Sequence, residues 1–274
     1  MNMKRNIKDI TRIYNSVAEF SAALSGPFNE SLFGNSWQRA SVTGSESFTG
    51  TPDYESADHL LNYGDSGSLE KMQAVKVRKN AGQGTEIRRR QINSVVGYAP
   101  NVPNYLRGVP VSMIGQNRVR VQSSKVVSIV YNFTVHCGVS EETIINESVK
   151  LLSVIGSMEK AGYRAGLSVM FSATKGAERY NIIIKVKDPG QYMDLRKLAY
   201  ILVNPSFLRR HCFRAMETEQ ELREPWNYGY GGVTEGDICK DIVKGAPALK
   251  ESKYIGFDDL LNRTPEEIEK NLLS

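Results

Sequence analysis

Residues Val126-Val-Ser-Ile-Val-Tyr-Asn-Phe-Thr-Val135 open the stretch 126–217, which decides the fold of this chain. The run is apolar and rich in β-branched residues, a composition typical of a buried strand. A polar break at residues 136–140 follows it. Apolar residues then recur at helical spacing until Gly162, which predicts an amphipathic helix packed against a sheet.

The second half of this stretch supplies two more strands and another helix. Residues 163–171 and 180–186 have strand character, and a helical pattern begins near Tyr192. A strand, a crossover helix and a second strand form a right-handed parallel unit, whereas the short turn at residues 174–178 makes the third strand antiparallel. The order β-α-β-β-α predicts an α/β fold with a mixed sheet, and an α+β fold stays open.

This order resembles the opening half of a von Willebrand factor A domain, and a ferredoxin-like arrangement fits it equally well. The first resemblance implies a divalent metal held after the first strand by Asp-x-Ser-x-Ser, because hard cations prefer carboxylate and hydroxyl oxygens. The residues at that place are Asn132, Thr134 and His136, or residues 136–140 in a shifted frame, and neither frame has a carboxylate. We therefore predict no metal site, and we expect Ser140 to cap the following helix.

The chain divides into three regions. Residues 1–96 are predicted to form a helical, basic region packed on the core, residues 97–217 the α/β core, and residues 218–274 an irregular extension. In the first region, Thr51-Pro52-Asp53 predicts a helix start, and residues 41–50 predict a loop.

A basic segment between residues 71 and 90 is the first candidate binding site. Its cationic residues are Lys71, Lys76, Arg78, Lys79, Arg88, Arg89 and Arg90. Such a cluster can neutralise phosphates of a nucleic acid, although a solvated surface has the same composition.

Arg209 and Arg210 form the second candidate, an anion or phosphate contact. They follow Asn204-Pro205-Ser206, where Pro205 ends one helix and Ser206 is expected to cap the next. Arginine is unfavourable at the positive end of a helix without an anionic partner. Pairing with Glu217 or Glu219 is the alternative explanation.

No segment carries a recognisable catalytic or cofactor-binding motif. The chain has neither a Gly-Lys-Ser/Thr phosphate loop nor a Gly-x-Ser-x-Gly elbow. Zinc is one hypothesis for His136-Cys137, His211-Cys212 and Cys239. Their spacing is not that of structural zinc sites, so we expect buried, inert cysteines instead. We predict no catalytic residue and no cofactor, and we favour a binding protein over an enzyme.

Bulk composition indicates a protein made in a reducing cytoplasm. The formal net charge is +5, and the chain contains three cysteines and no apolar run of the roughly 20 residues that a membrane helix needs. We therefore expect no membrane partner. The oligomeric state is left open.

Four stretches resemble an uncharacterised family of bacteriophage proteins: residues 48–64, 97–113, 158–164 and 194–217. The resemblance covers about residues 16–217 and implies no known activity. Our first hypothesis is a non-enzymatic phage protein of the host cytoplasm that binds a phage or host protein through its α/β core. The alternatives are a nucleic-acid-binding protein that uses residues 71–90 and a structural component of the virion.

Overall fold

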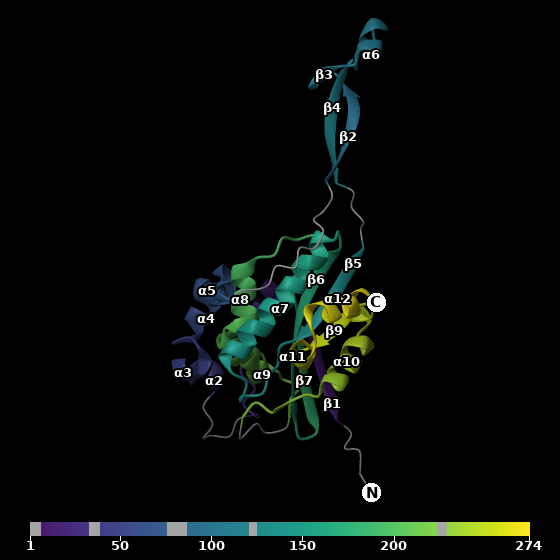
Figure 1. Cartoon of the computed structure of the whole chain (residues 1–274). Helices are drawn as coiled ribbons and strands as arrows, with labels where there is room; N and C mark the ends of the chain where they lie inside the picture. Colours follow the sequence, from purple (N-terminus) through teal and green to yellow (C-terminus); the bar gives the residue numbers. More distant parts are fainter. Residues whose placement is uncertain (1–6, 33–38, 76–86, 121–124, 224–228) are drawn as a thin grey trace.

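The computed structural model describes residues 7–32, 39–75, 87–120, 125–223 and 229–274, with the backbone alone for residues 87–91 and 116–120. These residues form a mixed sheet with helices on both faces and a second, three-stranded sheet (Figure 1). The predicted α/β fold with a mixed sheet is confirmed.

The main sheet has the strand order β1-β7-β6-β5-β9. The strands are β1 Lys8–Tyr14, β5 Val126–Asn132, β6 Arg164–Lys175, β7 Glu178–Lys187 and β9 Lys253–Gly256, and the short β8, Gly232–Val233, pairs with β6. β5 is parallel to β6 and β9, whereas β6 is antiparallel to β7. The predicted parallel pair and antiparallel third strand are therefore confirmed.

The crossover helix α7, Glu141–Lys160, has the start and end that the sequence predicts. The Thr143 N–H donates to Oγ of Ser140 at 3.2 Å, so Ser140 is the N-cap. Gly162 follows the helix with a φ of 95°, a left-handed conformation that glycine adopts without strain. Leu151 and Ile155 are fully buried between the helix and the sheet.

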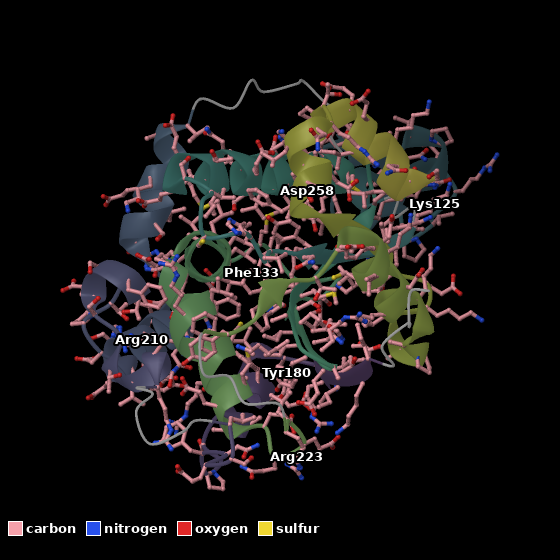
Figure 2. The ribbon with its side chains drawn as sticks, turned by 90° about the horizontal axis from the view of Figure 1, so that it is seen from below. Lys125, Phe133, Tyr180, Arg210, Arg223 and Asp258 are labelled. Carbon is pink, nitrogen blue, oxygen red and sulfur yellow. The ribbon has the colours of Figure 1, made fainter. Side chains whose placement is uncertain are left out.

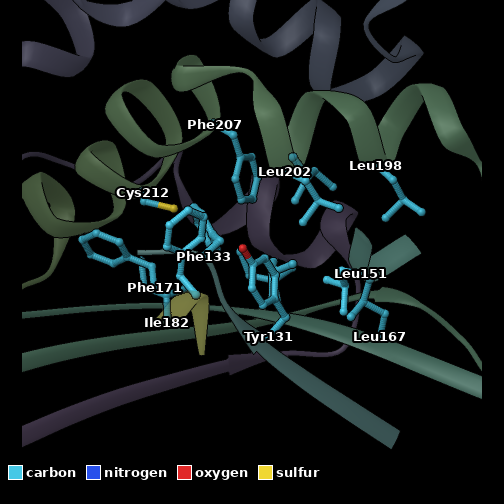
Figure 3. Close-up of a cluster of buried hydrophobic side chains, with 14 of the residues drawn as sticks. Tyr131, Phe133, Leu151, Leu167, Phe171, Ile182, Leu198, Leu202, Phe207 and Cys212 are labelled. Atoms are coloured by element: carbon cyan, nitrogen blue, oxygen red, sulfur yellow. The ribbon is translucent and has the colours of Figure 1, made fainter. Parts of the chain in front are cut away.

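A second group of helices packs on the same face of the sheet as α7. It consists of α8 Leu195–Val203, the π-helix η1 Phe207–Cys212 and α9 Phe213–Thr218. Aromatic side chains fill the space beneath it, and Figure 3 shows Tyr131 and Phe133 pointing from the sheet toward Phe207. The rings of Phe133 and Phe207 lie 5.4 Å apart, within the range of favourable aromatic pairs.

The N-terminal region is largely helical, as predicted, but it differs from the prediction at residues 8–14, 41–50 and 87–94. Its helices are α1 Val17–Ala23, α2 Ala40–Thr43, α3 Glu46–Thr49, α4 Tyr54–Tyr63 and α5 Ser66–Ala74. Residues 41–50 contain α2 and α3 and are not a simple loop. Asp53 caps α4, because its Oδ1 accepts from the Ser56 N–H at 2.7 Å. The region also contains β1, which the sequence did not reveal because only Ile10 of this edge strand is buried.

The C-terminal residues form regular structure, and the expected irregular extension was wrong. They contribute β9 to the sheet and the helices α10 Gly236–Gly245, α11 Phe257–Asn262 and α12 Pro265–Leu273, with a 3-10 turn η2 at Pro247–Leu249. Cys239 and Val243 of α10 pack on Val130, Met170 and Ile183. Alternate strand residues point to opposite faces, so α10 covers the face that α7 leaves open.

Residues 87–120 form a hairpin arm. Strand β2, Ile87–Ser94, pairs antiparallel with β4, Met113–Arg120, in an uninterrupted register from Ile87↔Arg120 to Ser94↔Met113. The short strand β3, Ala99–Pro100, also pairs with β4, and the helix α6, Val102–Leu106, lies at the tip. Figure 1 shows the arm extending away from the main sheet.

Candidate functional site

The hairpin arm contains an unusual concentration of positive charge. Its 87–120 sequence includes six arginines and no aspartate, glutamate or lysine; the arginines are Arg88, Arg89, Arg90, Arg107, Arg118 and Arg120. The whole chain has a formal net charge of +5, so the remaining residues together carry a net charge of −1. The excess positive charge of this protein therefore belongs to the arm.

The register of the arm brings together residues that are distant in sequence. Arg89 stands opposite Arg118, and Arg120 stands opposite Ile87. Like charges at directly opposed positions destabilise an antiparallel pair. Sequence reasoning included Arg89 but missed Arg118 and Arg120, because only the β2–β4 pairing joins them.

The tip of the arm, residues 95–112, exposes apolar side chains. Val96 is 81% exposed, Tyr105 70% and Leu106 78%, with Val95, Tyr98 and Val102 also exposed. Arg107 is the one charged residue of the tip sequence. Isolated exposed apolar residues are normal, but so many on one short segment make the tip a candidate interaction site.

Local hydrogen bonds hold this tip in a defined shape. Oδ1 of Asn101 accepts from the Asn104 N–H and caps α6, while the Asn101 N–H donates to Ser112 O at 2.7 Å. At Gly97 a Cβ atom would lie 2.2 Å from Ile114 O, so a larger residue does not fit. The apolar residues are thus presented by an ordered backbone.

The basic residues predicted from segment 71–90 are divided by the structure. Lys71 lies on α5, and its ammonium contacts Oε1 of Glu141 at 2.5 Å. Arg88, Arg89 and Arg90 lie on β2 of the arm. The predicted Lys76, Arg78 and Lys79 lie outside the described residues.

Arg210 of η1 is fully buried and bonds to the protein backbone. Its guanidinium donates to the carbonyls of Ser41, Gly44 and Thr51 at 2.7–3.1 Å. Arg209 is half-buried; it donates to Phe48 O and lies over the Phe48 ring at 4.5 Å. Figure 2 shows Arg210 among the helices of the N-terminal region.

Two expectations about this segment were wrong. Glu217 does not pair with either arginine: Ser41 Oγ and the Tyr230 hydroxyl donate to its carboxylate. Glu219 pairs with Arg12 at 2.8 Å. Ser206 also does not cap a helix, because its hydroxyl donates to Thr49 O at 2.6 Å. These contacts tie the 41–51 segment to η1 and α9.

A polar cavity of about 550 Å³ lies at the carboxyl end of β5 and β9. Ligands of open α/β sheets bind outside the carboxyl ends of strands, so this position is a second candidate site. Asn132, Thr134 and His136 line it, as does Tyr254. Nδ2 of Asn132 donates to the Tyr254 hydroxyl at 3.3 Å, and its Oδ1 accepts from the Thr134 N–H at 3.0 Å.

Charged residues of both signs also line this cavity. Asp237 and Lys240 come from α10, whereas Asp258, Asp259 and Arg263 come from α11 and its end. Arg263 pairs with Asp259 at 3.0 Å. Asp258 and Asp259 are distant from Asn132 in sequence, and only the pairing of β9 with β5 places them beside the Asn132 loop.

The cysteines differ from one another in burial. Cys212 and Cys239 are buried, as expected, but Cys137 is exposed. Burial raises the pKa of the Cys212 thiol well above its ordinary value, which disfavours the reactive thiolate. Within the described ranges, no three His, Cys, Asp or Glu side chains gather as a metal site would require. Nor does any described helix have the length and apolar character needed to cross a membrane.

Comparison with known proteins assigns the chain to a family. Neither a curated protein nor a solved structure matches it. The profile of one family, described as a domain of unknown function (DUF7192), matches residues 3–266 and so includes both the sheet and the arm. The chain therefore belongs to the DUF7192 family.

Proposed function

We propose that this chain is a non-enzymatic bacteriophage protein that binds nucleic acid through its hairpin arm. One observation carries the proposal: the arm has six arginines and no acidic residue, while the rest of the chain is close to neutral. Arginine forms bidentate contacts with phosphates, which both single-stranded and duplex nucleic acids present. The eight paired positions of β2 and β4 span about 27 Å, enough for several phosphates.

Binding of labelled oligonucleotides at increasing salt tests this function. Because each neutralised phosphate releases counterions, six contacts predict a slope of log affinity against log salt of about −4 to −5. Replacing Arg88, Arg89 and Arg90 by alanine should weaken binding at least tenfold and make the slope shallower. Replacing the exposed Lys244, Lys250 and Lys270 changes the net charge equally and serves as the control. Absence of binding even at about 50 mM salt would remove the proposal.

A protein partner held by the α/β core is the second candidate. It is supported by the polar cavity at the carboxyl end of β5 and β9. The parallel β5–β6 pair with an antiparallel β7 supports a von Willebrand factor A-like core, a kind of domain in which this edge faces the ligand. Pull-down from infected cells after nuclease treatment tests it. Asp258→Ala with Lys240→Ala should reduce capture of a specific protein, whereas Glu251→Ala with Lys250→Ala should not.

A further inference from the structure

We propose that the tip of the arm stacks on unpaired bases, so that the nucleic acid bound is single-stranded or locally unpaired. This inference rests on the proposed nucleic-acid function and adds the class of nucleic acid. It starts from the contrast between two parts of one hairpin. The ladder of β2 and β4 contains five of the six arginines, whereas residues 95–112 contain one arginine, two tyrosines and several aliphatic residues.

Within the part of the chain that the structure describes, packing leaves Tyr105 and Leu106 of the tip largely exposed. Tyr105 and Leu106 lie on α6 with 70% and 78% of their surface exposed, and Tyr98 is 64% exposed. In Figure 1 the tip is the part of the arm most distant from the main sheet, so it covers none of the core. Apolar side chains in this position can be buried only by contact with another molecule.

The order of the tip favours a rigid stacking platform. Asn101 caps α6, and the Val109 N–H donates to Asn104 O at 3.0 Å, which closes the turn after the helix. Nδ2 of Asn104 also donates to Val111 O at 3.3 Å. A ring held by such a backbone loses little conformational entropy on binding.

The arginines of the ladder and the aromatic rings of the tip together favour one class of nucleic acid. Arginines attract a polyanion without reading its sequence, and exposed aromatic rings stack on bases of any type. Bases within a duplex are already stacked on one another and must be separated before a ring can reach them. The faces of unpaired bases are accessible to an aromatic ring without prior separation of stacked bases. The ladder should therefore hold the phosphate backbone while the tip holds the bases.

Fluorescence anisotropy with the full chain tests this assignment. The probes are a labelled single strand and the duplex of the same sequence at low salt. The single strand should bind more tightly, and Tyr105→Ala or Tyr98→Ala should weaken it about tenfold while changing duplex affinity less than about twofold. Tyr105→Phe keeps the ring and should restore single-strand binding. Tyr192→Ala removes a tyrosine outside the arm that is 87% exposed, more than either tip tyrosine, and should have no effect.

The outcomes separate this inference from the function on which it rests. Loss of duplex and single-strand binding in the Arg88–Arg90 variant, with no effect of the tyrosine variants, would overturn the stacking role and retain the nucleic-acid function. No binding to either probe would overturn both. Self-association in sedimentation experiments, abolished by Tyr105→Ala without any change in oligonucleotide affinity, would assign the tip to a second copy of this chain.

Discussion

Arg210 and Thr51 are joined by two hydrogen bonds in the buried interior. The guanidinium donates from Nε to the Thr51 hydroxyl at 3.0 Å and from Nη2 to the Thr51 carbonyl at 2.7 Å. A buried guanidinium is stable only when its donors find acceptors, and here the backbone of residues 41–51 supplies them. Arg210 thus organises the N-terminal helices around η1.

Arg210→Ala should destabilise the fold strongly. The variant leaves several carbonyls without a donor and opens space in the interior, so the free energy of unfolding should fall by about 3 kcal/mol or more. Arg209→Ala is the matched control on the neighbouring residue. It removes one hydrogen bond and a cation–π contact at a half-buried position, and should cost about 1 kcal/mol. Urea unfolding of both variants measures the difference, and equal losses would contradict this role.

Glu217 should make stability depend on pH. Burial raises the pKa of its carboxyl above the ordinary value of 4.5. The folded chain then binds more protons than the unfolded chain, so this group contributes a loss of stability as the pH rises above 4.5. Glu217→Gln should remove that part of the slope. The test is urea unfolding of the parent and the variant across pH 4.5 to the neutral range, and parallel curves would exclude the effect.

His211 should have the opposite effect. Burial lowers the pKa of its imidazole below 6.5, while Nδ1 lies 3.0 Å from the Tyr200 hydroxyl and Nε2 lies 3.9 Å from Oδ1 of Asp58. The unfolded chain then binds more protons than the folded one, so stability is lost as the pH falls through 6.5. The difference in unfolding free energy between the parent and His211→Phe should change with pH in this window. An imidazole that titrates above 6.5 by NMR would refute the prediction.

Gly97→Ala should disturb the arm and leave the body intact. The added Cβ would lie 2.2 Å from Ile114 O, so β3 and the tip must shift away from β4. Hydrogen exchange of residues 95–115 should accelerate, with the thermal unfolding of the main sheet unchanged. Gly156→Ala is the control in α7, where a Cβ meets no atom within 4 Å. It should stabilise the helix by about 0.5–1 kcal/mol. Unchanged exchange at the tip in Gly97→Ala would contradict the steric argument.

Local patterns were reliable where backbone hydrogen bonds and burial act over a few residues. Ser140 and Gly162 bound α7 because capping and left-handed glycine are properties of neighbouring residues. The strand β1 was missed, because its place in the sheet depends on β7, more than 160 positions away in its register. The place of β9 likewise depends on its pairing with the distant β5, and so does the position of Asp258 and Asp259, which follow it.

The amino-acid sequence by itself determined the α/β class, the β-α-β-β-α order and the basic character of residues 71–90. These follow from periodicity, turn chemistry and composition, which depend on residues that are close in the sequence. Only the tertiary structure decided that Arg118 stands opposite Arg89, that Arg210 is buried against Thr51, and that Asp258 lies beside the Asn132 loop. Such relationships arise when strands pair and helices pack across long separations, because the free energy that selects them belongs to the whole fold.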